Sequence, residues 1–492
     1  MTKFFSFVRS KPVFLILLPL FFVFRGFTDN YNAVPLKDAL LLLLLYIAAT
    51  LILFLLAWLF YKNVLKAAVL SFILMAFHFF FGAIQDFLKN FFSDSFITEY
   101  RFLLPCFIVF FILLIEFLKR TRKPLGRFSM YLNLLLGIFI LVDLPLLVQK
   151  MLHRNLSMNV RPSYIINCDN CTKPDIYFLV FDEYSSSSAL KETWNYDNSE
   201  IDSFLIRKGF RLLPHSRSNY NFTEFSIAST LNMDYLNIPN PSACTIKDYN
   251  NCFEMIKNNQ VCSILSSMGY EIANYSIFDI QKNPSPVSES FLPLKTKLIT
   301  SQTFISRVKK DLFHLLLVGK FEIKWLSRDL IYATHHNNQK IIRSILHDSS
   351  NTGNGPRFVY SHIEMPHPPF YYNKFGQQRS KLELIKDSQG ILSYLEYLPK
   401  TNEVIKQIIT SILTHSKRPV AILLIGDHGF RQDQSKDFQF RNLNAIYISS
   451  GNYSGFHDST TNVNEYRILF NNLFQASLPL KKDSTIFLFD KK

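Results

Sequence analysis

Long apolar runs dominate the chain before about residue 150. Five apolar segments can be drawn there: residues 12–24, 39–61, 67–85, 102–118 and 128–148. A membrane-spanning helix needs about 20 predominantly apolar residues, a length that the second, third and fifth segments approach. The few charged residues of these segments lie near segment ends, where they can reach the membrane interface. The pattern predicts a helical membrane anchor of about five spans.

The first apolar segment has a second interpretation as a secretory signal peptide, because Lys3, Arg9 and Lys11 precede its short apolar core. Residues 21–30 contain no small-residue cleavage site, and further apolar segments follow. A retained first helix is therefore favoured.

Basic residues are distributed unequally between the two sides of five such spans. One side carries Lys3, Arg9, Lys11, Lys62, Lys66, Lys119, Arg120, Arg122, Lys123 and Arg127. The other side carries Arg25, Lys37, Lys89 and Arg101. Because cytoplasmic loops are enriched in Lys and Arg, the amino terminus is predicted in the cytoplasm and the chain after about residue 150 on the outer face.

The formal net charge of +15 is spread over both parts of the chain. After the spans it is a mild surplus, which suits an anionic lipid surface or phosphorylated substrates. The sequence contains no zinc finger, RNA-binding signature or basic helix, so no nucleic-acid partner is expected.

Shorter apolar runs alternate with helical patterns in the rest of the chain. Strands are predicted at residues 176–181, 358–361, 420–425 and 445–448, and helices at 200–208 and 402–413. This alternation is typical of an α/β domain with a mixed or largely parallel sheet covered by helices. The predicted organisation is a membrane anchor at 1–150, a polar linker at 151–174 and an α/β metalloenzyme domain at 175–492. Residues 237–281 and 285–326 show no clear pattern.

Five of the six cysteines follow the spans: Cys168, Cys171, Cys244, Cys252 and Cys262. An oxidising compartment permits disulfides, and Cys168 with Cys171 or Cys244 with Cys252 are close enough in sequence to pair. A structural zinc site is disfavoured because there is no second Cys-x-x-Cys pair.

Two of the predicted strands end in groups that bind metals. In IYFLVFDEY the apolar run is followed by Asp182 and Glu183, and in ILLIGDHGF it is followed by Asp427 and His428. Sites in open α/β sheets lie beyond the carboxyl ends of strands, so Asp182, Asp427 and His428 are expected to converge. Two carboxylates and an imidazole form a plausible divalent-metal site, with zinc the first choice and manganese or magnesium as alternatives.

A hydroxyl nucleophile is suggested by NYNFTEFSIASTLNM, residues 219–233, which passes from a loop into a helical pattern and places Thr223 at the helix start. Thr is a common N-cap, and this is the structural interpretation. In the functional interpretation, helix-terminal amides favour an anion and a bound metal lowers the hydroxyl pKa. Thr223 would then attack phosphorus or sulfur.

A third strand runs into the irregular segment EMPHPPF, and this stretch carries His362, Glu364 and His367. Prolines after His367 prevent helix continuation and help to hold it in a loop at the strand end. His367 could donate to a phosphoryl oxygen or protonate a leaving group, although each histidine taken alone also fits a structural role.

FDEY, NFTEFSIASTLN, MPHPPF and GDHG, in this order after a five-helix anchor, resemble the sulfatase-like branch of the alkaline phosphatase superfamily. The architecture is similar to lipid A phosphoethanolamine transferases and lipoteichoic acid synthases. The resemblance implies a metal held by Asp182 (or Glu183), Thr223, Asp427 and His428, with Thr223 as the nucleophile. The substrate-binding residues that it implies are His367 and, as further candidates, His362, Arg431, Arg441 and His457.

The Cys-x-Pro-x-Arg segment that true sulfatases convert to formylglycine is absent, so sulfate-ester hydrolysis by that route is not expected. The resemblance implies an enzyme on the outer face of a bacterial inner membrane. It would transfer a phosphoethanolamine- or glycerophosphate-type head group from a membrane lipid to an envelope glycan or glycolipid through a covalent phospho-threonine. The alternatives are a phosphatase, phosphodiesterase or other sulfatase-like hydrolase, and a non-catalytic envelope binding or assembly factor.

Overall fold

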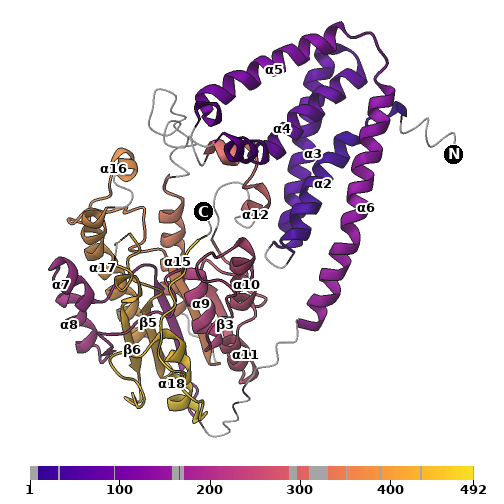
Figure 1. Cartoon of the computed structure of the whole chain (residues 1–492). Coiled ribbons are helices and arrows are strands. Elements are labelled where there is room, and N and C mark those ends of the chain that lie inside the picture. Colours follow the sequence, from indigo (N-terminus) through magenta and orange to yellow (C-terminus); the bar gives the residue numbers. More distant parts are fainter. Residues whose placement is uncertain are drawn as a thin grey trace. The chain divides into compact units, whose positions relative to one another are not determined.

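The chain forms two compact units in the computed structural model (Figure 1). The structure describes residues 9–31, 34–92, 95–157, 164, 166, 171–287, 296–309, 331–350, 353, 355–386, 390–432 and 435–490. The first unit is Met1–Ser157 with Ser290–Lys324, and the second is Met158–Glu289 with Trp325–Lys492. The sequence predicted three consecutive parts, with boundaries at residues 150 and 174. In the structure, the first unit also includes Ser290–Lys324, a segment from within the predicted third part. Part of the predicted linker lies outside the described residues.

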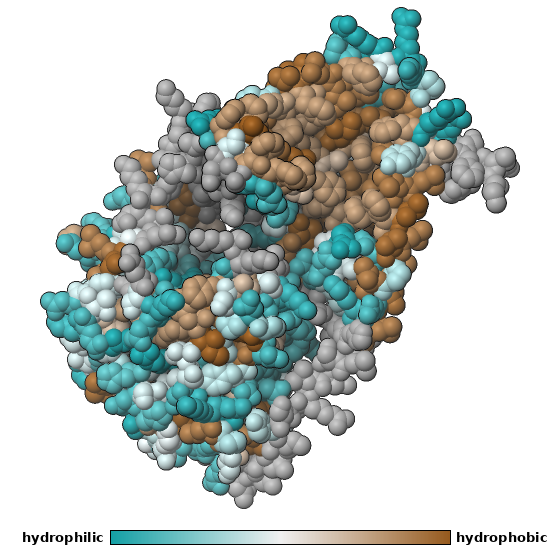
Figure 2. All heavy atoms as spheres, in the orientation of Figure 1, coloured by the Kyte–Doolittle hydropathy of each residue, from teal (hydrophilic) through white to brown (hydrophobic). Residues whose placement is uncertain are grey.

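The first unit is a set of long helices with an apolar exterior. They are α2 (Phe14–Asp29), α3 (Leu36–Tyr61), α4 (Val64–Phe91), α5 (Tyr100–Arg120) and α6 (Gly126–Ser157). Figure 2 shows hydrophobic residues over much of their visible surface. Among the described residues, four helices are long and apolar enough to cross a membrane: Leu36–Tyr61, Val64–Phe91, Tyr100–Arg120 and Gly126–Leu152. An apolar exterior on helices of this length suits a lipid environment.

The first predicted span, residues 12–24, corresponds to the short helix α2. At about 1.5 Å per residue its 16 residues extend about 24 Å, less than the hydrocarbon core of about 30 Å. Its two ends nevertheless lie beside α6, because the Phe14 amide donates to Asn133 Oδ1 at 2.5 Å and Lys150 Nζ donates to the Thr28 carbonyl at 2.6 Å. The expectation of about five spans is thus corrected to four helices of spanning length and one shorter helix parallel to α6.

A segment from far along the chain completes the first unit. α12 (Lys297–Thr300) packs against α2, where a Cβ atom on Gly26 would lie only 2.6 Å from Ile299 Cγ2. The amide of Gly82 on α4 donates to the carbonyl of Gln302 at 2.8 Å. A side chain at either glycine would block this close approach, so both positions require the smallest residue.

The second unit is built on a six-stranded mixed sheet with the order β2-β6-β5-β1-β4-β3. The strands are β1 (Asp175–Phe181), β2 (Arg211–Leu212), β3 (Glu271–Tyr275), β4 (Arg357–Ile363), β5 (Val420–Gly426) and β6 (Asn444–Ile448). β1 is parallel to both of its neighbours, β4 and β5, and β3 is parallel to β4. β6 is antiparallel to β5, and β2 is antiparallel to β6. Every residue of β1, β4 and β5 is buried, as expected for central strands covered on both faces.

Helices cover this sheet. One face packs in a common core with α9 (Thr223–Asn232), α10 (Ile246–Lys257), α11 (Gln260–Ser267) and α18 (Asn462–Phe474). In that core the ring of Phe178 stacks on Tyr360 at 5.2 Å and meets Tyr466 edge-on at 5.4 Å. The remaining helices are α7 (Ser187–Trp194), α8 (Ser199–Arg207), α15 (Ala333–Ser350), α16 (Lys381–Lys386) and α17 (Ile391–His415). α15 packs against β3 and β4, and α17 packs against α15.

The predicted fold class is confirmed, since apolar helices are followed by an α/β unit with a mixed sheet. The four predicted strands correspond to β1, β4, β5 and β6, and the two predicted helices lie in α8 and α17. β3, α10 and α11 lie in the stretch that showed no pattern. β3 is exposed or half-buried along its whole length, so it has no continuous apolar run to reveal it. Most of residues 285–326 lies outside the described part of the chain.

Of the four described cysteines of the second unit, one is disulfide-bonded and three are free and buried. Cys171 is disulfide-bonded, while Cys168, its predicted partner, lies outside the described residues. Cys244 and Cys252 are free and buried, so the predicted alternative of a bond between them is wrong. Burial raises the pKa of Cys252, which keeps the thiol protonated and lets it pack as a small apolar group.

Glu465 on α18 is a carboxyl group buried in the second unit. Its Oε1 accepts a hydrogen bond from Asn444, and its Oε2 has no hydrogen-bond partner. Burial raises the pKa of Glu465 from 4.5 to about 8. Because the folded state favours the neutral carboxyl, its contribution to stability is complete below about pH 4.5 and is lost as the pH rises through about 8.

We expect Glu465→Gln to remove this loss and to raise the melting temperature at pH 8, by the equivalent of roughly 2–4 kcal/mol of unfolding free energy. The difference from wild type should shrink towards pH 5. Thermal unfolding of the detergent-solubilised full chain at both pH values measures it. Glu200→Gln, at an exposed ion pair with Lys406, is the matched control and should show a small change at both pH values. An effect of Glu465→Gln that does not grow with pH would contradict the prediction.

Candidate active site

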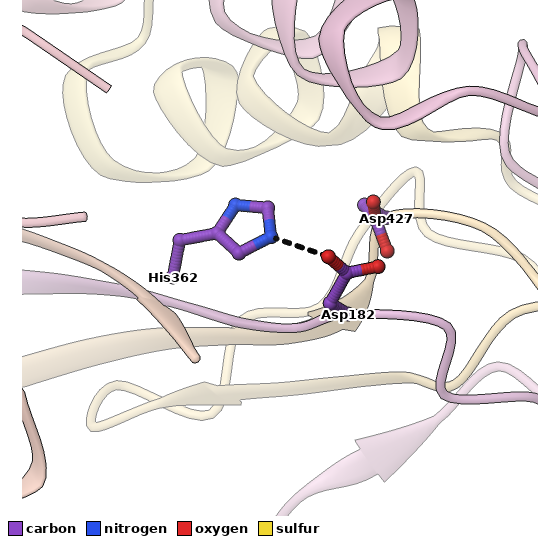
Figure 3. Close-up of side chains that lie close together, drawn as sticks. All are labelled: Asp182, His362 and Asp427. Carbon is purple, nitrogen blue, oxygen red and sulfur yellow. Dashed lines mark ion pairs between the residues drawn. The ribbon is translucent and has the colours of Figure 1, made fainter. Parts of the chain in front are cut away.

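Three neighbouring strands end at the same edge of the sheet and carry the candidate site. Asp182 directly follows β1 and Asp427 directly follows β5, while His362 lies next to the end of β4, opposite Val180. One ligand atom from each of Asp182, His362 and Asp427 lies within 4.8 Å of the others, and all three residues are buried. Figure 3 shows the three side chains close together. The structure thus brings Asp182 and Asp427 together, as the strand pattern predicted.

Three buried atoms of this cluster have no hydrogen-bond partner: Asp182 Oδ1, His362 Nε2 and Asp427 Oδ2. The nearest approach of His362 Nε2 to Asp182 is 3.6 Å to Oδ2, beyond hydrogen-bond distance. An unsatisfied buried polar group costs about 1–3 kcal/mol, and more when it is charged. A cation between these atoms would satisfy all three. Carboxylate oxygen and imidazole nitrogen are donors that zinc and other divalent metals accept, so the donor set fits a divalent metal.

The two carboxylates of the cluster perturb one another. Burial and the charge of Asp182 raise the pKa of Asp427 above its ordinary value. Burial alone would raise the pKa of Asp182, but the neighbouring His367 and His362 lower it. The charged form of Asp182 is therefore favoured, and its charge disfavours the charged form of Asp427. A bound cation would favour the charged form of both.

His428 adjoins the two carboxylates from the loop after β5. Its Nε2 lies 3.3 Å from Asp427 Oδ2 and 3.9 Å from Asp182 Oδ1. Burial and the nearby Arg431 lower the pKa of His428 to about 4, so the imidazole is neutral at pH 7. Its Nδ1 lies 2.8 Å from the Gly429 carbonyl, which can only accept a hydrogen bond. The ring proton therefore resides on Nδ1, and the lone pair of Nε2 faces the site, as a metal ligand requires.

Thr223 is the first residue of α9, and its hydroxyl faces His428. Its Oγ1 lies 3.1 Å from His428 Nε2, and the residue is 7% exposed. The N-cap position is Phe222, and no side chain caps the helix. The N-cap interpretation of Thr223 is therefore wrong, because its hydroxyl contacts the imidazole and no helix amide.

Glu183, the alternative ligand after β1, has a different set of contacts. Its φ angle is +60°, in the left-handed region that few non-glycine residues adopt. In this conformation its amide donates to Asp427 Oδ1 at 3.0 Å, and its Oε1 accepts from Arg431 Nε at 2.9 Å. Arg431 also lies over the Phe222 ring at 5.4 Å. Glu183 thus orients Asp427 and holds Arg431 beside the site.

His367 lies next to the carboxylates in the loop after β4. One ligand atom from each of Asp182, Glu364 and His367 lies within 4.8 Å of the others. Burial alone would lower the pKa of His367, but Asp182, Glu183 and Glu364 raise it above its ordinary value. Its Nδ1 lies 2.6 Å from the Pro368 carbonyl and so carries a proton. The charged form of His367 is favoured, which suits a group that donates to a phosphoryl oxygen.

Arg441 and His457, two further candidates for substrate binding, form ion pairs outside the cluster. Arg441 is directed to Glu192 at 2.7 Å, and His457 to Asp483 at 3.4 Å. Glu192 and His457 are at least half exposed, whereas the cluster is buried. These contacts do not bring Arg441 or His457 into the cluster.

The sequence pattern gave Glu364 no role and treated His362 as a substrate contact. Because every residue of β4 is buried, no alternation along the strand marks the side on which His362 lies, and only the pairing of β4 with β1 places it beside Asp182.

Residues 328–465 match the sulfatase family model. The matched segment contains β4, β5, His362, His367, Asp427 and His428, and it begins after Asp182 and Thr223. No curated protein sequence matches the chain.

Solved structures with a similar arrangement include phosphoethanolamine transferases at very low identity. The C-terminal periplasmic domain of EcEptC from Escherichia coli, in complex with Zn, is 8% identical with a TM-score of 0.42, and the match covers 67% of this chain and 93% of that one. The integral membrane lipooligosaccharide phosphoethanolamine transferase A from Neisseria meningitidis is 10% identical with a TM-score of 0.37, and the match covers 95% of both chains. The C-terminal periplasmic domain of phosphoethanolamine transferase EptC from Campylobacter jejuni is 11% identical with a TM-score of 0.38, covering 65% of this chain and 100% of that one.

A sulfatase family match over residues 328–465, on a mixed α/β sheet with buried metal-binding groups at its strand ends, indicates a sulfatase-like enzyme domain. This is the class that the four sequence motifs predicted. The first unit adds helices that are long and apolar enough to anchor this domain in a membrane.

Proposed function

We propose that this enzyme transfers a phospho-head group from a membrane lipid to an envelope glycan or glycolipid, with Thr223 as the nucleophile. The observation that carries the proposal is the position of Thr223. Its hydroxyl faces His428 Nε2 at 3.1 Å, beside the buried atoms of Asp182 and Asp427 that lack a hydrogen-bond partner. A hydroxyl at the first turn of a helix and next to a metal site is favoured as an attacking alkoxide.

The residues that would hold the metal are Asp182, Thr223, Asp427 and His428, with His362 added by its place in the cluster. When bound, a divalent metal supplies positive charge that lowers the pKa of the Thr223 hydroxyl and stabilises a phosphoryl oxygen. Zinc is the first choice, since imidazole groups are present, with manganese or magnesium as alternatives.

The proposed reaction has two displacements at phosphorus. The Thr223 hydroxyl releases its proton to solvent, its Oγ1 forms a bond to the phosphorus of the lipid phosphodiester, and the bond from phosphorus to the glycerol oxygen of diacylglycerol breaks. His367, whose charged form is favoured, donates a proton to that leaving oxygen. An acceptor hydroxyl then attacks the phospho-threonine and passes its proton to His367, the Oγ1–P bond breaks, and Thr223 regains a proton from solvent. Arg431, held by Glu183, adds positive charge beside the site.

The membrane supplies the reason for a lipid donor. The anchor holds the enzyme at the surface where phosphodiester lipids are concentrated, which raises the effective concentration of the substrate. The asymmetry of basic residues supports an outer-face location in a bacterial inner membrane, and the disulfide at Cys171 suits that oxidising side.

The covalent intermediate provides the test. We incubate the full chain with phosphatidylethanolamine or phosphatidylglycerol and no acceptor, and then measure the mass of the peptide containing Thr223. We expect an increase equal to phosphoethanolamine or glycerophosphate, and no increase in Thr223→Ala. Loss of the adduct that is faster with an acceptor glycolipid supports a transferase, and equal loss with and without it supports the hydrolase alternative. Turnover without any adduct on this peptide would overturn the proposed intermediate.

A further inference from the structure

A basic cavity lies at one end of the helices of the first unit. Its volume is about 1170 Å³. Three separate stretches of chain line it: the residues before α2, the turn from α3 to α4, and the turn from α5 to α6. The cationic residues of its lining are Arg9, Lys66, Arg122, Lys123 and Arg127.

No described residue supplies a counter-ion for these charges. No acidic residue lines the cavity, and none of its five cationic residues forms an ion pair with another described residue. Other cations of the same helices are paired, such as Arg25 with Asp143 at 2.7 Å and Arg120 with Glu116 at 2.6 Å. Five like charges around one cavity repel one another unless an anion enters it.

Several contacts fix the lining in place. Lys66 Nζ donates to the Lys119 carbonyl at 3.1 Å, which joins the two turns. Arg9 lies directly on Gly126, where a Cβ atom would come within 3.1 Å of Arg9 Cγ. The Asn63 side chain accepts from the Lys66 amide at 3.1 Å and begins α4. These contacts hold the cationic residues in place around the cavity.

The cavity also has an apolar part, formed by Leu65, Leu125 and Met130. It lies at the ends of α4 and α6, two of the helices long enough to span a membrane. The three stretches that line it are those that the charge asymmetry assigns to the cytoplasmic side. A small soluble anion needs no apolar neighbour, whereas a phospholipid presents a phosphate together with its glycerol and acyl carbons.

We infer that this cavity binds the head group of an anionic phospholipid from the leaflet on that side. The phosphate would lie among the guanidinium and ammonium groups, and the glycerol end against Leu65, Leu125 and Met130. Basic pockets between membrane helices recognise anionic lipids in this way. This site is separate from the candidate active site and does not depend on the proposed function.

The test uses phosphatidylglycerol as the anionic probe and phosphatidylcholine as the zwitterionic one. We titrate the detergent-purified full chain with each lipid and measure bound lipid by native mass spectrometry. The variant Arg9→Gln/Lys66→Gln/Arg127→Gln is expected to bind phosphatidylglycerol on the order of 100-fold more weakly, with little change for phosphatidylcholine.

Matched variants separate the cavity from general charge. Lys37→Gln/Lys62→Gln/Lys89→Gln removes the same charge from basic residues outside the lining and should keep wild-type affinity. Lys66→Arg/Lys123→Arg keeps the charge and should also bind. Thermal unfolding of each variant shows that the fold persists. Equal losses in both triple variants would overturn the inference, as would complete displacement of the lipid by excess soluble glycerol phosphate, which would indicate a site for a free anion.

Discussion

Thr223→Ala is expected to lower turnover by on the order of 10³-fold or more, while thermal stability changes little and the remaining carboxylate and imidazole ligands keep the metal bound. The variant lacks the attacking oxygen, so the covalent phospho-threonine of the proposed path cannot form. It loses no helix cap, because the Thr223 hydroxyl contacts His428. The stability cost is therefore that of one hydrogen bond, about 1 kcal/mol. Thr223→Ser keeps the hydroxyl and should retain part of the activity. Turnover of a lipid phosphodiester by the full chain measures the effect.

Thr230→Ala is the matched control for this result. Thr230 is a buried threonine on the same helix, and its hydroxyl donates to the Ser226 carbonyl at 2.8 Å. Its replacement removes a hydroxyl and one hydrogen bond without touching the candidate site, so activity should persist. Normal turnover in Thr223→Ala would reduce Thr223 to a structural residue.

The second large effect is expected in bound metal. Asp182→Asn, Asp427→Asn, His428→Ala and His362→Ala should each weaken metal binding by roughly tenfold or more, and the first three should abolish turnover. Elemental analysis of the purified full chain measures the metal, with zinc expected first. The fold should persist, because the core of the second unit lies along the strands and not at their ends.

A chelator distinguishes loss of the metal from loss of the fold. Removal of the metal from the wild type leaves Asp182 and Asp427 buried and mutually repelling, so the melting temperature should fall. Asp427→Asn already lacks that repulsion, and its melting temperature should respond little to the chelator. His457→Ala, at a surface ion pair, should behave as the wild type. Unchanged metal content in both Asp427→Asn and His428→Ala would place the metal elsewhere.

The parts of the fold that the sequence predicted are those whose residues are buried on both sides. β1 and β5 are apolar and buried at every position, so they stand out in the sequence. The polar residues that interrupt such runs, Asp182 and Asp427, then mark the ends of the strands. This is why the meeting of two carboxylates could be expected before any coordinates were known.

Other features depend on neighbours that are distant in the sequence. His362 joins Asp182 only because β4 pairs with β1 in a particular register, which places it opposite Val180. Edge strand β3 lacks an apolar run, and the free thiols of Cys244 and Cys252 show that spacing alone does not determine pairing. Thr223 was assigned to the start of a helix, but only the structure shows that its hydroxyl contacts His428 and does not cap the helix.

The return of residues 296–309 to the helices has a consequence for synthesis. When α6 leaves the ribosome, the surfaces of α2 and α4 around Gly26 and Gly82 still lack the residues that will cover them, and Asp86 lacks Arg307. Those partners are made about 140 residues later, after β1, β2 and β3. The first unit can therefore be completed only while the second unit is still being translated. Assembly of the first unit thus depends on synthesis of part of the second.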